Sequence, residues 1–133
     1  EPNDSLDQVE RAALDGLDAT MAATLESDED VDLYAVDVPA GRGLRAEVIP
    51  TAAATSCDGF NTRLAFLGDD GLEQVARSSG LDACAFLDGT GDAPRHQQVA
   101  NPTAQTRRMV VAVTTAFQGP SAALPYRIAF TVR

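Results

Sequence analysis

The strongest constraint on the fold is a strict alternation of side chains at the end of the chain. Large apolar residues occupy every second position, at Tyr126, Ile128, Phe130 and Val132, and the residues between them are small or polar. Successive side chains of a β-strand point to opposite faces of a sheet, so this pattern predicts a strand with one buried and one solvent-facing side. The same period recurs in residues 33–38, 44–48 and 60–66.

Two further patterns complete an all-β prediction. Residues 109–113 are apolar without interruption, which is typical of a central strand. Turn-forming residues separate the strand candidates at 39–41, 69–71, 88–91 and 119–120. The sequence therefore predicts a β-sandwich of two antiparallel sheets, with a core that includes Tyr34, Val36, Leu64, Phe66, Val111, Val113, Ile128 and Phe130.

Only the N-terminal segment has a helical spacing. Leu6, Val9 and Ala13 recur at this spacing, and Asp4 or Ser5 is available as an N-cap. A short helical turn is expected over residues 5–13.

Length and charge limit the domain count and the classes of partner. A chain of 133 residues forms one domain, here residues 1–133, and no run of about 18 apolar residues is present to form a transmembrane helix. The formal net charge is −10, and the ten basic residues, all arginine, form no basic stripe. This charge excludes nucleic acid and anionic membranes as partners, and it leaves cations, polar surfaces and other proteins.

The two cysteines are candidates for a disulfide. If Asp70 and Gly71 form the two-residue turn of a β-hairpin, Cys57 and Cys84 lie directly opposite each other across that hairpin. A bulge would shift this register, so two separate buried thiols remain the alternative. A disulfide would place the chain in an oxidising compartment outside the cytoplasm.

An acidic segment precedes the first well-defined strand. Residues 27–32 contain four acids, Asp28, Glu29, Asp30 and Asp32. A solvated acidic loop is one interpretation. The other is a site for Ca²⁺, which takes six to eight oxygen ligands, with Glu1, Asn3 and Asp4 supplying the other half. The second acidic loop, residues 88–92, lacks the spacing of a calcium motif and is interpreted as a turn.

The sequence contains no credible catalytic constellation. His96 is the only histidine, and its polar neighbours predict a solvated loop position. No G-x-S-x-G nucleophile elbow is present, a phosphate-binding loop cannot form without lysine, and the cysteines and histidine lack zinc spacing. We therefore expect a protein that is not an enzyme.

Four motifs in order resemble the bacterial pre-peptidase C-terminal domain family. They are EPNDS at the start, DVDLYAVDVPAG at 30–41, FNTRLAFLGDDG at 60–71, and RRMVVAVTTA followed by PYRIAFTV at 107–132. The likeness spans essentially the whole chain. The sequence departs from the family at residues 105–108, which lack the Gly-x-Tyr-Tyr lead, at the insertion around 51–58, and in its two cysteines, Cys57 and Cys84.

The resemblance implies a jelly-roll-like sandwich attached to secreted bacterial enzymes outside their catalytic domains. Related collagen-binding domains hold Ca²⁺ between an acidic N-terminal linker and an Asp-bearing loop. Carried over to this sequence, the metal ligands are Glu1, Asn3, Asp4, Glu29 and Asp32.

The expected function is a non-catalytic, extracytoplasmic, calcium-assisted accessory module. It would adjoin a domain of a larger secreted enzyme or surface protein and aid its secretion, its stability or its attachment to a polymeric substrate. The alternative is a glycan- or protein-binding module that uses an exposed sheet face without metal. An exposed row of aromatic side chains would favour glycan binding.

Overall fold

The structure is a computed structural model that describes residues 18–51, 57, 61–79, 84–116 and 123–133. The described residues form eight strands and one turn of 3₁₀-helix, η1 at Gln97–Val99. The strands are β1 Asp18–Leu25, β2 Asp32–Val38, β3 Leu44–Pro50, β4 Thr62–Leu67, β5 Glu73–Ser78, β6 Phe86–Asp88, β7 Arg107–Thr115 and β8 Leu124–Val132. The predicted helical turn at 5–13 lies outside the described residues.

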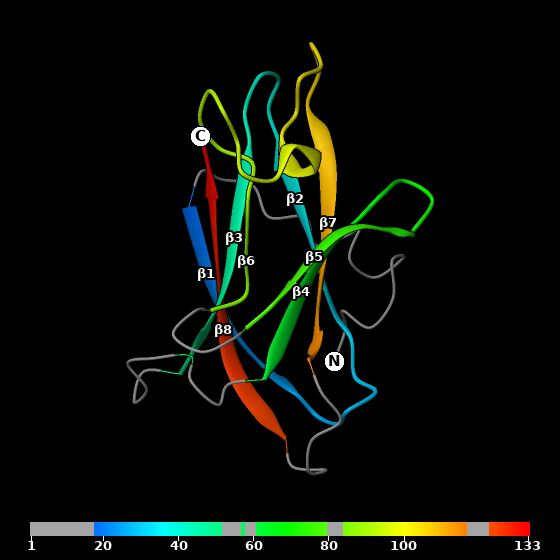
Figure 1. Cartoon of the computed structure of the whole chain (residues 1–133), viewed down its shortest axis with the longest axis vertical. Coiled ribbons are helices and arrows are strands. Elements are labelled where there is room, and N and C mark those ends of the chain that lie inside the picture. The colour runs from blue at the N-terminus through cyan, green and yellow to red at the C-terminus, as the bar shows by residue number, and fades with distance from the viewer. Residues whose placement is uncertain (1–17, 52–56, 58–60, 80–83, 117–122) are drawn as a thin grey trace.

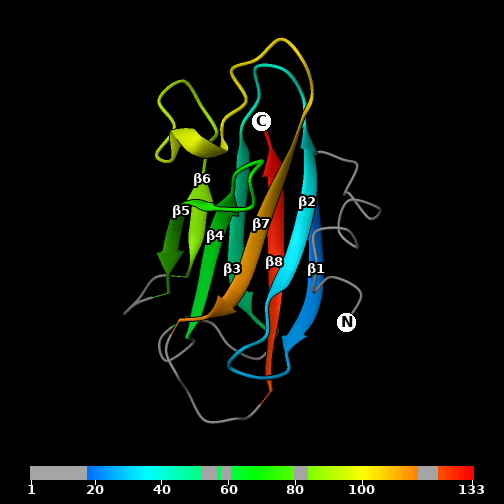
Figure 2. The same ribbon diagram turned by 90° about the vertical axis from the view of Figure 1, so that its right-hand side faces the viewer.

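The strands form two four-stranded sheets in jelly-roll order. One sheet runs β1-β8-β3-β6 and the other runs β2-β7-β4-β5, and all the strand pairs are antiparallel. Figure 1 shows the strands running along the long axis, and Figure 2 shows the two sheets face to face with β1 and β2 on the same side. No helix in the described part of the chain is both long and apolar enough to cross a membrane.

The core lies between the sheets where the alternation places it. All eight predicted core residues are buried, and the four apolar residues of β8 point inward together. The phase of the last strand is therefore confirmed.

The outer face of the β2-β7-β4-β5 sheet is more buried than the alternation of its residues predicts. Leu33 and Ala35 of β2 lie on the outer face, yet they are buried in a second apolar cluster with Ala65 and Ala112. These residues are neighbours across β2, β7 and β4, and partly buried apolar side chains pack against them, among them Val31, Leu67 and Val110.

The β4–β5 hairpin has the predicted register with a different turn. Arg63 lies opposite Ser78, which is the register that places Cys57 opposite Cys84. The turn is centred on Asp69 and Asp70, because the Gly71 N–H donates to the Gly68 carbonyl at 2.9 Å. Gly71 follows with a φ of 75°, and the register shifts again between Phe66 and Leu67. Two bulges thus restore the register that a turn at Asp70 and Gly71 would have given.

The loops at the end of the sandwich near the C-terminus are locked together by backbone contacts. The Gly43 N–H donates to the Arg133 carbonyl at 2.7 Å, and the Gly41 N–H donates to the Asn101 carbonyl at 2.9 Å. The buried Asn101 amide also donates to the carbonyls of Val38 and Gln105, each at 2.8 Å. One side chain therefore fixes the loop after β2 against the loop before β7.

Candidate functional site

The acidic residues predicted to bind metal form the turn between β1 and β2. A carboxylate oxygen of Asp30 accepts the Glu26 N–H at 2.6 Å, and the Asp30 N–H donates to the Ser27 carbonyl at 3.2 Å. The Thr115 hydroxyl donates to the Asp28 carbonyl at 3.2 Å and anchors the turn to β7. The turn is therefore ordered by its own residues and by a neighbouring strand.

The acids of this turn have no cationic neighbour in the described part of the chain. None of the ion pairs between described residues includes Glu26, Asp28, Glu29 or Asp30. The ion pairs that are present lie on the strands and at the other end of the sandwich, for example Arg108 with Asp37 at 2.8 Å. The β1–β2 turn thus concentrates negative charge at one end of the molecule.

Asp32 lies in the core rather than on the acidic surface. It is fully buried, and its carboxylate accepts the Tyr126 hydroxyl at 2.5 Å. The hydroxyls of Tyr126 and Tyr34 are 2.7 Å apart. Burial and these hydrogen bonds raise the pKa of Tyr126 well above its ordinary value. The network joins β2 to β8 across the two sheets.

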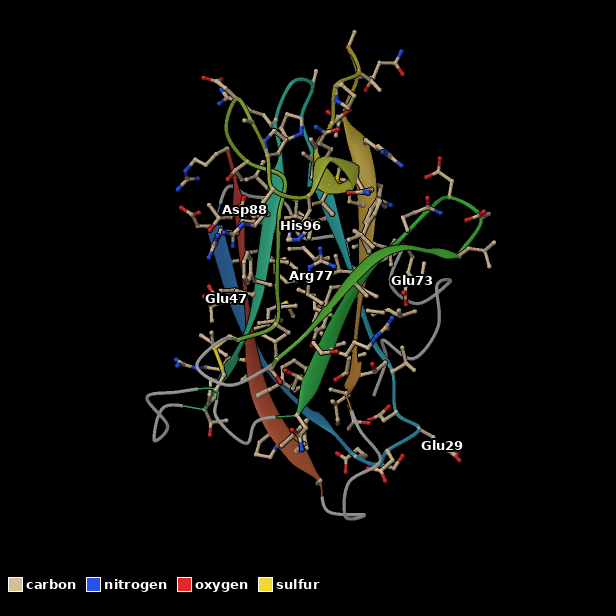
Figure 3. The ribbon with its side chains drawn as sticks, viewed as in Figure 1. Glu29, Glu47, Glu73, Arg77, Asp88 and His96 are labelled. Atoms are coloured by element: carbon tan, nitrogen blue, oxygen red, sulfur yellow. A yellow bond between two sulfur atoms is a disulfide. The ribbon has the colours of Figure 1, made fainter. Side chains whose placement is uncertain are left out.

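The described part of the predicted metal set does not converge. Glu29 is exposed and points away from the sandwich in Figure 3, whereas Asp32 is buried. Within the described residues no three His, Cys, Asp or Glu side chains gather as a metal site. Glu1, Asn3 and Asp4 lie outside the described residues, so the metal set stays a prediction.

The two cysteines form the disulfide that the hairpin register allowed. Cys57 and Cys84 are bonded, with their Cα atoms 5.1 Å apart. Cys57 precedes β4 and Cys84 follows β5, so the bond links the chain at the open end of the β4–β5 hairpin. Disulfides persist in oxidising compartments, so the chain is an extracytoplasmic protein.

His96 is buried, and the prediction that it lies in a solvated loop position is wrong. It is 4% exposed, and its ring Nδ1 accepts the Asp88 backbone N–H at 2.9 Å. The backbone N–H of His96 donates to the Asp88 carbonyl at 2.7 Å. Its ring packs edge-on against Phe86. Burial, with Arg77 and Arg95 nearby, lowers the pKa of His96. The imidazole is thus a neutral structural acceptor for the loop after β6, and its Nδ1 is not available as a general base.

A shallow hollow that no sequence pattern predicts lies beside the β4–β5 turn. It measures about 400 Å³ and is lined by Phe66, Gly68, Asp69, Asp70, Gln74, Gln98 and Arg107. The Arg107 guanidinium lies over the Phe66 ring at 5.6 Å and 3.8 Å from an Asp69 carboxylate oxygen. The lining residues come from three separate stretches of the chain, so no local sequence motif predicts the hollow.

The described aromatic side chains form no exposed platform. Tyr34, Phe66, Tyr126 and Phe130 are buried. Phe86 is half-buried and has the guanidinium groups of Arg45 and Arg95 over its ring, at 5.2 and 5.4 Å. The row of exposed aromatics that would favour glycan stacking is not present among the described residues.

Comparisons with known proteins identify the fold. No protein-family model matches the sequence, and no curated protein matches it significantly. The pre-peptidase C-terminal domain of a Bacillus anthracis collagenase is similar with a TM-score of 0.52 and 11% identity, over 91% of this chain and 92% of that one. The fold expected from the sequence resemblance is thus confirmed.

Other solved structures share the fold. PliG of Salmonella Typhimurium, a periplasmic inhibitor of g-type lysozyme, is similar with a TM-score of 0.54 and 13% identity, over 91% of this chain and 96% of that one. The mitogen derived from Yersinia pseudotuberculosis is similar with a TM-score of 0.50 and 13% identity, over 86% and 84% of the two chains. One fold carries these different roles, so the function of this chain must be argued from its own residues.

Proposed function

We propose that this chain is a non-catalytic accessory module of a larger secreted protein, and that it is stabilised by calcium. The observation that carries the non-catalytic part is the buried His96: its Nδ1 accepts the Asp88 N–H, so the neutral ring carries its proton on Nε2 and neither nitrogen is free to act as a base. The disulfide places the module in a compartment where Ca²⁺ is available to extracellular domains.

The calcium part of the proposal rests on the β1–β2 turn. Its acids Glu26, Asp28, Glu29 and Asp30 lie within five residues of sequence, and none of them takes part in an ion pair between described residues. Like charges at short range repel, and a divalent cation would offset that repulsion while supplying a fixed point for the N-terminal ligands Glu1, Asn3 and Asp4. Among the described residues, exposed Glu29 is best placed to contribute a ligand.

A thermal melt with and without calcium tests this proposal. Calcium at about a hundred times its dissociation constant would stabilise the fold by about 2.7 kcal/mol, so the melting temperature should rise relative to a sample with chelator. The variant Glu29→Gln should reduce this rise. It is a cleaner variant than Asp32→Asn, which would also alter the buried group that accepts the hydrogen bond from Tyr126.

The control is Asp92→Asn, which removes an exposed acid from the loop after β6. It loses the same charge and should keep the full response to calcium. A wild-type melting temperature that is equal in calcium and in chelator would contradict the calcium proposal. The module would then be stabilised by its disulfide and core alone.

A second candidate is a module that binds a cationic protein. The net charge of −10 supports it, because an acidic surface speeds association with a basic partner. The PliG structures, described as lysozyme inhibitors, carry a protein-binding role on the same fold. Binding measured at two salt concentrations against a basic and an acidic protein of equal size separates this candidate from the first.

A further inference from the structure

In the part of the chain that the structure describes, the outer edge of β1 lacks the features that protect an edge strand. β1 pairs with β8 over all eight of its residues without a register shift, and no other described strand pairs with it. An edge strand presents a row of N–H and C=O groups to any strand that approaches. The only charged residue of β1 is Asp18 at its first position, where Arg133 pairs with it at 3.0 Å.

The other three edge strands each carry a protective feature. β6 has only three residues. β5 carries Glu73 and Arg77, and its pairing with β4 is bulged. β2 carries Asp37, which is paired with Arg108. Short length, charge, bulges and cover are the usual means by which proteins prevent strand pairing at an edge. Among the described residues, none of these protects β1 along its seven residues after Asp18.

Met21 adds an apolar anchor at this edge. It lies opposite Ile128 in the strand register, and Ile128 is fully buried in the core. Met21 therefore faces the same inner side of the sheet, yet it is 37% exposed. No described strand lies beside β1 on its outer side to cover this inward-facing residue. A strand added along β1 would cover the flexible Met21 side chain.

The acidic β1–β2 turn begins immediately after β1. Glu26 follows Leu25, and Glu29 is exposed at the end of the same turn. A chain laid along β1 and continuing past Leu25 would run into this negative charge. Basic residues would be favoured there, whereas a like-charged extension would be repelled.

We propose that the β1 edge binds an extended segment of another protein by strand addition. The segment would be uncharged where it pairs with β1 and would carry arginine or lysine residues where it passes the β1–β2 turn. Main-chain hydrogen bonds would supply affinity, and Met21 and the acidic turn would supply selectivity. A second copy of this chain fits less well because each copy carries a net charge of −10.

Synthetic peptides test this proposal in the presence of chelator, so that calcium plays no part. The probe has three arginines followed by six alternating threonines and valines, an order that places the arginines at the turn when the peptide pairs antiparallel. A second probe has the reverse order for parallel pairing. Fluorescence anisotropy should show saturable binding of one of them, and N-methylation of alternate residues in that peptide should abolish it, because the main-chain donors are lost.

Matched variants locate the binding surface. Met21→Lys should weaken binding at least tenfold, because an inward charge on an edge strand opposes pairing. Leu72→Lys is the control, since Leu72 is the other exposed large apolar residue of the described chain and lies on the β4–β5 turn. It should leave binding within twofold. Glu29→Gln should weaken binding and reduce its dependence on salt. Thermal melts of all three variants verify that they fold.

Four outcomes of the peptide, variant and sedimentation experiments would overturn the proposal. They are failure of both probes to bind, equal binding of the N-methylated probe, equal effects of Met21→Lys and Leu72→Lys, and a dimer in sedimentation that Met21→Lys dissociates. The last would make a second copy the occupant. Protection of all β1 amides from exchange in the free chain would also overturn it, because the edge would already be occupied. None of these results bears on the calcium melt.

Discussion

The Tyr126 hydroxyl lies 2.5 Å from a carboxylate oxygen of Asp32, and this hydrogen bond ties β8 of one sheet to β2 of the other. Both residues are fully buried, and the Tyr34 hydroxyl extends the network. A buried carboxylate is costly to desolvate unless donors satisfy it. The two tyrosine hydroxyls therefore allow the Asp32 carboxyl group to lie in an otherwise apolar core.

The variant Tyr126→Phe should destabilise the fold by about 2–3 kcal/mol, because it removes a hydrogen bond to a buried charged group. Urea denaturation measures this loss. A double-mutant cycle with Asp32→Asn isolates the interaction between the two residues from the other contacts of each. If the two single losses simply add up in the double variant, the hydrogen bond contributes no coupling and this account is wrong.

Tyr126 should also make the fold sensitive to alkali. Its pKa in the folded state is raised above the ordinary value of 10.0, first by burial and then by its hydrogen bonds. The unfolded chain then loses this proton at a lower pH than the folded chain. The stabilisation is complete below about pH 10 and is lost as pH rises above that value. The free energy of unfolding should fall over this range in the wild type and less steeply in Tyr126→Phe.

His96 predicts a second pH dependence, on the acid side. Burial lowers the pKa of His96 below its ordinary value of 6.5, so the unfolded chain takes up a proton that the folded chain resists. The stabilisation is present above pH 6.5 and is lost as pH falls below it. His96→Asn, which keeps an acceptor without titrating, should flatten the stability profile between about pH 4 and 7. An unchanged slope in this variant would assign the acid sensitivity to carboxylates instead.

The strand pattern could be predicted from the sequence because each strand alternates about a shared core, and its phase needs no tertiary information. The same alternation already places Asp32 on the inner face with Tyr34 and Val36, a signal that the acidic context of residues 28–32 obscured. The burial of His96 could not be predicted, because it depends on packing against Phe86 and on main-chain contacts with Asp88. The unprotected edge of β1 likewise follows only from the sheet order.

Loss of the disulfide should have a large effect on stability. The bond joins residues 27 apart in sequence, and closing such a loop stabilises the fold by about 3.6 kcal/mol in the chain-entropy model. The double variant Cys57→Ser with Cys84→Ser should lose about this amount in urea denaturation. Mass spectrometry of unreduced protein should recover the linked pair of peptides. Two freely alkylated thiols in protein from an oxidising compartment would contradict the assignment.

The loop end near the C-terminus should tolerate no side chain at Gly43. A Cβ placed there would lie 1.7 Å from the Gly89 carbonyl oxygen, a backbone atom that a side-chain rotation cannot move. The Gly43 backbone is also held by Arg133 through reciprocal hydrogen bonds of 2.7 and 3.1 Å. Gly43→Ala should therefore force the β2–β3 and β6–β7 loops apart and cost about 3 kcal/mol or more.

The matched control for Gly43 is Gly41→Ala, two residues earlier in the same loop. Gly41 has a φ of 70° with nothing within 4 Å of its Cβ position, so alanine there meets only the backbone strain, about 1 kcal/mol. Urea denaturation of both variants measures the difference. If both variants lost the same free energy of unfolding, moving the two loops apart would cost nothing. The hydrogen bonds of Asn101 would then not hold these loops together. A larger loss at Gly43 would identify this end as a rigid part of the module, in contrast to the β1 edge that we propose as its docking surface.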